Sequence, residues 1–324
     1  MKYLLIMLAF ISINISQAKS EVPVKLPNQL ILKYSLINTA EYHVYKKEYT
    51  QALSELNKIA STRPYYPIYL AKLKCFIGLN RKDEIEQIIK KIIVDFGVYH
   101  NHILNDLKLA KFSLTCPPIS INEDSCYLLF LFRNLNHRRD LFDVEHLFFN
   151  DLLFRNQLSA INGKSFKENF VLAKQYDSAI VTPFILSLIK KYNFPDSYDI
   201  GEYSTSLLYF MLRHNDVAKT ILDSALICGK IPPIEYAQLT DYLHNYKYNP
   251  EGAKIGFHQN FGTLYSTTPD NTWFIQPPDD IEHVDERRTA IGLPPLWQTA
   301  LINGYKLPEE YIKWLKKNKI PFEK

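Results

Sequence analysis

Glycine is scarce in this chain, with only ten among 324 residues. That scarcity disfavours a many-stranded β-sandwich, which needs many glycine-rich turns. Leucine, isoleucine, lysine, tyrosine and asparagine are abundant instead, and 47% of the residues are hydrophobic, which excludes a disordered chain. We therefore predict a mainly α fold of helices joined by short turns. Its length fits one large or two smaller domains.

Long apolar runs are absent beyond the N-terminus. Lys2 precedes an apolar run from Tyr3 to Ile15, and Ser16-Gln17-Ala18 supplies the small residues that a signal peptidase reads. We predict a signal peptide over residues 1–18 and export to the periplasm or the extracellular space. An ordinary buried N-terminal helix is the alternative. No later segment approaches the roughly 20 apolar residues of a spanning helix, so we expect no membrane span in the mature chain.

The chain also lacks a strong charge of either sign. Its formal net charge is +4, which falls to +3 when Lys2 leaves with the signal. Nucleic-acid binding needs a concentrated basic stripe. We therefore predict no nucleic-acid partner.

Motifs of familiar enzymes are missing as well. The sequence contains no His-Glu-x-x-His, no Gly-x-Ser-x-Gly, no glycine-rich phosphate loop and no Cys-x-x-Cys. His100 and His102 have one residue between them, but no metal-binding pattern comes after them. We predict no metal and no cofactor, while an unfamiliar enzyme stays open.

Cysteines are few, at positions 75, 116, 126 and 228. In an exported chain such residues can form disulfides. Cys116 and Cys126 flank a helix-breaking segment that begins with Pro117-Pro118, so we predict a disulfide that closes this loop. Free buried thiols are the alternative, because four cysteines allow three connectivities. Cys75 lies on an apolar helical face, which favours a place in the core.

An internal repeat of 33 residues marks the first part of the chain. Ala52, Leu56 and Ile59 recur as Ile85, Ile89 and Ile92. This spacing puts one buried face on each of two helices, which Pro64 and Gly97 would end. Residues 34–97 resemble tetratricopeptide units, so we predict helical hairpins here. Two units are fewer than a stable stacked array needs, so the hairpins should pack on later segments of the chain.

Polar and turn-forming motifs gather in the second half of the chain. They are Phe194-Pro195, Ile200-Gly201-Glu202, His214-Asn215-Asp216, Ala237-Gln238-Leu239-Thr240-Asp241, Gln259, Gly262-Thr263, and the stretch from Asp285-Glu286-Arg287-Arg288 to Leu296. In order and spacing they resemble the bacterial family catalogued as domain of unknown function 6624, over about residues 145–300. The resemblance implies a mostly helical domain and no known reaction, substrate or cofactor. The family's usual arginine and glutamine are replaced here by Tyr242 and Leu264.

Local patterns predict where some of these motifs lie. A helix from Pro232-Pro233 would carry Tyr236, Leu239 and Leu243 inward and leave Asp241 on the opposite side.

Further along, aromatic and β-branched residues between Phe257 and Gln276 predict a small β-hairpin with Gly262 at a bulge or close approach in its first strand. Asp279 or Asp280 can then cap the helix that carries Arg288.

These motifs define a candidate site. The candidate catalytic residues are His214, Asp241 and Thr263, and the candidate ligand-binding residues are His258, Gln259, Glu286 and Arg288. A histidine with a carboxylate is the minimum for general base catalysis, and an arginine can hold an anionic group. The alternative is that the same side chains cap helices and satisfy backbone groups.

These predictions are compatible with two functions. We favour an exported binding or interaction protein, with its N-terminal helical hairpins facing a protein partner. A hydrolase of a polar envelope substrate is the alternative. In either case, residues 1–18 form the signal peptide, 19–125 the helical-hairpin region, and 126–324 a C-terminal helical domain with the β-hairpin.

Overall fold

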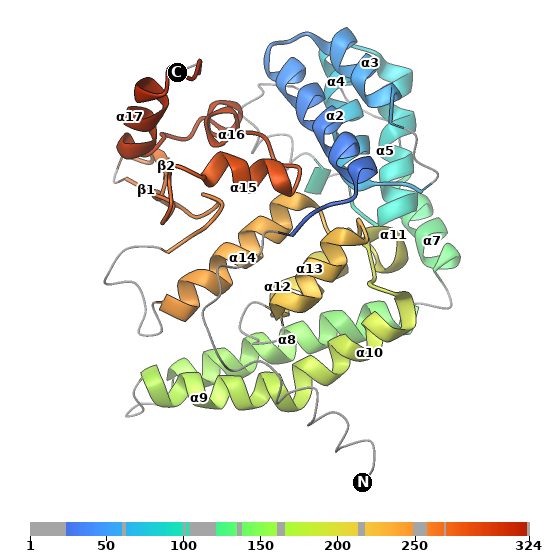
Figure 1. Ribbon diagram of the computed structural model, residues 1–324. Helices are drawn as coiled ribbons and strands as arrows, with labels where there is room; N and C mark the ends of the chain where they lie inside the picture. Colours follow the sequence, from blue (N-terminus) through green and yellow to red (C-terminus); the bar gives the residue numbers. More distant parts are fainter. Residues whose placement is uncertain are drawn as a thin grey trace.

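The computed structural model (Figure 1) describes most of the chain, namely residues 24–59, 63–99, 102–103, 121–134, 138–160, 166–212, 218–248, 258–268 and 270–322. The fold is mainly α with one small two-stranded antiparallel sheet, as predicted. In the described part of the chain, no helix has both the length and the apolar character needed to cross a membrane. The predicted signal peptide lies outside the described residues.

The first four helices of the described residues form two helical hairpins, drawn in blue to cyan in Figure 1. They are α2 (Asn28–Tyr45), α3 (Tyr49–Asn57), α4 (Tyr66–Gly78) and α5 (Lys82–Phe96). Equivalent positions of the predicted repeat are buried on α3 and α5, namely Ala52, Leu56, Ile85, Ile89 and Ile92. As predicted, α5 ends at Gly97, which adopts the left-handed conformation with φ 66°. The helix α3 ends at Asn57, so Ile59 lies beyond it.

The middle of the described chain contains one long helix, α8, and several shorter ones. Its elements are α7 (Glu123–Arg133), α8 (Arg138–Ala160), α9 (Phe166–Tyr176), the π-helical turn η2 (Asp177–Val181) and α10 (Thr182–Tyr192). Figure 1 shows α9 and α10 following one another end to end beside α8, along the base of the molecule. Here α7 packs on α5, and α8 packs on α12 (Glu202–Met211), so this part of the chain contacts both the N-terminal hairpins and the later helices.

The last part begins with four helices: α11 (Ser197–Ile200), α12 (Glu202–Met211), α13 (Ala218–Ile227) and α14 (Pro233–Tyr248). The predicted β-hairpin comes next as β1 (Tyr265–Thr267) and β2 (Trp273–Ile275), antiparallel with Tyr265 opposite Ile275. The chain then forms α15 (Val284–Ala290), α16 (Leu296–Asn303) and α17 (Glu309–Lys317).

Two local predictions for this part need correction. Gly262 precedes β1 instead of lying within it, although its φ of 71° and a Cβ position 2.8 Å from Leu296 Cδ1 do mark a close approach. The helix α15 has no side-chain cap. Asp280 instead accepts a hydrogen bond from Arg287 and lies 3.0 Å from Nδ1 of His283.

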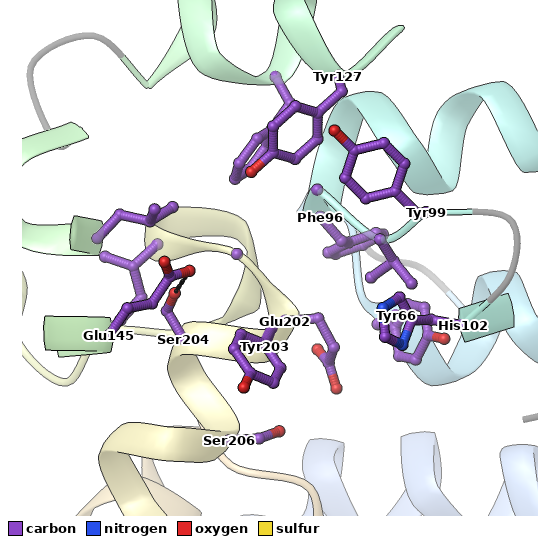
Figure 2. Close-up of a pocket in the computed structure, with 16 residues that line it drawn as sticks. Tyr66, Phe96, Tyr99, His102, Tyr127, Glu145, Glu202, Tyr203, Ser204 and Ser206 are labelled. Atoms are coloured by element: carbon purple, nitrogen blue, oxygen red, sulfur yellow. Dashed lines mark hydrogen bonds between the residues drawn. The ribbon is translucent and has the colours of Figure 1, made fainter. Parts of the chain in front are cut away.

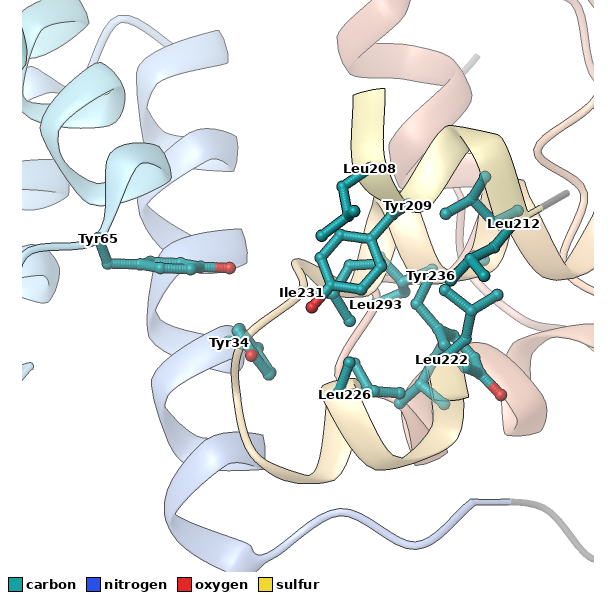
Figure 3. Packing of buried hydrophobic residues seen from close by; sticks show 14 of the residues in the cluster. Tyr34, Tyr65, Leu208, Tyr209, Leu212, Leu222, Leu226, Ile231, Tyr236 and Leu293 are labelled. Atoms are coloured by element: carbon teal, nitrogen blue, oxygen red, sulfur yellow. The ribbon is translucent and has the colours of Figure 1, made fainter. Parts of the chain in front are cut away.

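One buried cluster joins the N-terminal hairpins to the later helices. Figure 3 shows Tyr34 and Tyr65 from the hairpin region facing Tyr209 and the leucines of the later helices. At its rim, Arg63 donates to both Asp196 (2.8 Å) and Asp199 (2.6 Å). The predicted domain boundary after residue 125 stays a prediction, and the core continues across it.

The cysteines are described in part. Cys75 is buried, in agreement with the prediction that it belongs to the core. Cys126 is half-buried, and Cys116 lies outside the described residues. The disulfide between Cys116 and Cys126 therefore stays a prediction.

Candidate functional site

Asp241 on α14 lies at the centre of a closed polar cluster. Its carboxylate accepts hydrogen bonds from the backbone N–H groups of Asn260 (2.7 Å), Phe261 (2.9 Å) and Thr263 (3.0 Å). The Thr263 hydroxyl donates a fourth, at 2.6 Å. Burial raises the pKa of Asp241, and these four hydrogen bonds act in the opposite direction. The loop of residues 259–264 is therefore wrapped around a single carboxylate.

The prediction that Asp241 lies on the face of α14 away from the core is wrong. Tyr236 and Leu239 are buried as predicted, but Asp241 is buried too, with none of its surface exposed. The reason is that the loop of residues 259–264 covers the other side of α14.

The Gln259 side chain links the same loop to the β-hairpin through hydrogen bonds. Its Oε1 accepts a hydrogen bond from the Leu264 N–H (2.7 Å), and its Nε2 donates to the carbonyl of Gln276. The Gln276 N–H in turn donates to the Leu264 carbonyl at 3.0 Å. The buried side-chain amide of Gln259 thus provides hydrogen-bond partners for two backbone groups that the short strands leave unpaired.

Arg288 closes the cluster from α15. Its guanidinium donates to the carbonyls of Phe261 (2.7 Å) and Pro294 (2.7 Å) and to the hydroxyl of Thr299. The side chain is completely buried, and burial lowers its pKa to about 10. Arg288 therefore ties three separate segments together through neutral acceptors.

The remaining predicted site residues lie elsewhere or outside the described residues. His258 Nδ1 is 3.2 Å from Oδ1 of Asp279, whose other oxygen is 2.8 Å from Nε2 of His244. Glu286 is exposed on α15. His214 lies outside the described residues. The structure therefore joins Asp241, Thr263, Gln259 and Arg288 through one loop, while Glu286 faces solvent.

The chemistry of this cluster is that of a structural polar core. Asp241, Gln259 and Arg288 have no exposed surface, and each bonds to several protein groups. Buried polar groups that are bonded in this way fix a unique arrangement of the chain. A substrate has no open carboxylate or guanidinium to contact here. The catalytic and binding roles proposed for these residues stay predictions.

A cavity of about 350 Å³ lies elsewhere, between the helical hairpins and the later helices (Figure 2). Aromatic rings from α4, α5, α7, α12 and the segment after α5 form much of its wall, namely Tyr66, Phe96, Tyr99, Tyr127, Phe130 and Tyr203. Polar side chains also reach it, namely His102, Glu145, Glu202, Ser204 and Ser206. No lysine or arginine is among the described residues that line it.

Ring contacts and two glycines set the shape of the cavity wall. Tyr99 and Tyr127 stack with their ring centroids 4.6 Å apart, and Tyr127 and Phe130 come next at 5.6 Å. A Cβ on Gly97 would lie 2.6 Å from Phe130 Cε1, and one on Gly201 would lie 3.0 Å from its Cζ. Both glycines have positive φ. Glycine is therefore needed at both positions for the Phe130 ring to fit.

Glu145 is a cavity carboxylate held only weakly by the protein. It lies on α8, and the Ser204 hydroxyl on α12 donates to its Oε1 at 3.4 Å, as drawn in Figure 2. No ion pair joins Glu145 to any described residue. Burial raises its pKa, and the weak bond from Ser204 opposes that shift.

Comparisons with known proteins assign no function to the Asp241 cluster or to the cavity. No family model, curated protein or solved structure matches the chain. The resemblance to domain of unknown function 6624 stays a prediction, as does the tetratricopeptide-like character of the hairpins. In the part of the chain that the structure describes, no group of three or more histidines, cysteines or acidic residues is arranged to hold a metal ion.

Sequence reasoning did not find the cavity, because its walls come from segments that are far apart in the chain. One signal for it was present. Ile200-Gly201-Glu202 belongs to the motifs that carry the family resemblance, and all three residues line the cavity. The abundance of tyrosine, with 22 residues, was a second and less specific signal.

Proposed function

We propose that the protein binds a small molecule with an apolar body in the cavity beside Tyr127 and Glu145. The observation that carries this proposal is the cavity of about 350 Å³ with aromatic rings in its wall and a few polar groups among them. Ligand sites commonly have volumes of roughly 300 to 1,000 Å³, an apolar lining and a few polar groups that orient the ligand. The predicted signal peptide would place this binding in the periplasm or outside the cell.

This proposal narrows the broader prediction of a binding or interaction protein. Binding of a protein partner by the helical hairpins stays compatible with it. The hydrolase alternative is less well supported, because the carboxylate of Asp241 and the guanidinium of Arg288 are buried and bonded within the protein. A general base must reach the proton that it removes.

A fluorescence titration tests the proposal. The neutral probe N-phenyl-1-naphthylamine becomes bright in apolar surroundings and is small enough for the cavity. We expect saturable binding to the wild-type protein. Ser206 lines the cavity from α12, so Ser206→Phe should fill part of it and weaken binding about tenfold or more.

Ser187→Phe is the matched control, because Ser187 is exposed on α10 and does not line the cavity. It should leave binding unchanged. Ser206→Leu provides a smaller filling residue should the phenylalanine variant fail to fold. Equal binding by wild type and both Ser206 variants would place the probe elsewhere and overturn the proposal.

A further inference from the structure

We propose that the ligand of this cavity carries a positive charge, as a primary amine or a related small organic cation. This inference rests on the proposed function and concerns the same cavity. It gives the chemical class of the ligand, which the volume and aromatic lining alone do not define.

The first argument is the charge of the lining. Two carboxylates, Glu145 and Glu202, reach the cavity, and no lysine or arginine accompanies them in the described lining. Figure 2 shows Glu145 beside Ser204 and Glu202 beside Tyr203. An anionic ligand would meet the like charge of Glu145, whereas a cation would meet an opposite one. The site therefore discriminates by charge before any detailed fit.

The second argument is the state of Glu145. Its hydrogen bond from Ser204 has the long distance of 3.4 Å, and burial raises its pKa. A carboxylate that loses water without gaining a charged partner is destabilised in its ionised form. An ammonium group in the cavity would supply the missing charged partner. Binding would in turn lower the pKa of Glu145.

The third argument is the aromatic wall. The electron-rich faces of tyrosine and phenylalanine attract cations, and this attraction is strongest where water is excluded. Tyr99 stacks on Tyr127 at the cavity, and Phe130 lies tilted against Tyr127. Aromatic faces combined with carboxylates are the chemistry that recognises an ammonium group attached to an apolar body. Glu145 would hold the charge while the rings contact the remainder of the ligand.

Isothermal titration with three matched probes tests this inference. They are 2-phenylethylamine, the neutral 2-phenylethanol and the anionic 3-phenylpropionate, which share one ring and a similar length. We expect the amine to bind about tenfold or more tightly than the alcohol, and the carboxylate to bind least.

Two variants locate the charge. Glu145→Gln should weaken binding of the amine about tenfold and leave the alcohol nearly unchanged. Asp143→Asn removes a carboxylate from the same helix at a position outside the cavity, and it should change neither.

The possible failures can be told apart. Equal affinity for amine and alcohol would keep the cavity as a binding site and overturn its preference for cations. Stronger binding of the carboxylate would overturn that preference as well. Absence of binding for all three probes, together with N-phenyl-1-naphthylamine, would overturn the proposed function itself.

Discussion

Two carboxylate–hydroxyl pairs in this molecule have opposite surroundings. Asp241 accepts a hydrogen bond from Thr263 at 2.6 Å and three more from backbone N–H groups. Glu145 accepts one from Ser204 at 3.4 Å and borders a cavity. The same kinds of side chain thus form a closed joint in one place and an open site in the other. The number of hydrogen bonds already made by the protein separates the structural Asp241 from Glu145, the carboxylate that we propose contacts a ligand.

The strongest test of this contrast removes the guanidinium that closes the Asp241 cluster. Arg288→Met would leave the carbonyls of Phe261 and Pro294 without the donor that now reaches them. We expect a loss of about 3 kcal/mol or more in the free energy of unfolding, because buried acceptors would lack partners. Urea denaturation measures it.

Arg139→Met is the control for this loss, since the Arg139 side chain is 92% exposed. It should change the free energy of unfolding by about 0.5 kcal/mol or less. Equal effects of the two variants would contradict the structural role of Arg288.

Asp241→Asn tests the carboxylate itself. The amide NH₂ would face backbone donors where an acceptor is required, so we expect a loss of about 2 kcal/mol in the free energy of unfolding. Binding of N-phenyl-1-naphthylamine to the folded variant should be unchanged. The opposite pattern, normal stability with lost binding, would move the ligand site to Asp241 and reverse the comparison.

The smallest expected effect concerns the free energy of unfolding in the absence of ligand. Glu145→Gln should stabilise the empty protein at neutral pH by about 0.3 kcal/mol, because Glu145 is only partly buried and solvent screens its charge. Its pKa is raised in the folded state, so wild type loses stability as pH rises above the usual value of 4.5 through the raised one.

Below that window the carboxyl is protonated in the folded and the unfolded chain, and the difference between wild type and Glu145→Gln should vanish. Urea denaturation at several pH values measures this trend. A wild type that becomes more stable relative to the variant as pH rises would indicate a cationic partner within the protein.

The sequence was sufficient for features that depend on local patterns. The spacing of Ala52, Leu56, Ile85 and Ile89 correctly predicted buried helix faces, and Gly97 correctly predicted a helix end. The β-hairpin was also recognisable from its aromatic and β-branched residues. These features result from periodicity and from the backbone preferences of single residues.

Features that depend on contacts between residues far apart in the chain are harder to predict from the sequence. Asp241, Thr263 and Arg288 were grouped correctly, but their motifs do not reveal that each polar group is already bonded within the protein. Helical periodicity placed Asp241 away from the core because it considers one helix alone. The cavity needed the joint positions of segments from Tyr66 to Ser206, which no local pattern specifies.

The contact between Gly292 and Tyr34 has a consequence for how this sequence can vary. A Cβ on Gly292 would lie 2.8 Å from Tyr34 Cδ2, and the φ of Gly292 is 81°. Asn38, one turn after Tyr34 on α2, donates to the carbonyl of Gly292 at 2.7 Å. A substitution at Gly292 is therefore restricted by the side chains of α2, and a larger residue at position 34 or 38 of α2 is restricted by the backbone at Gly292.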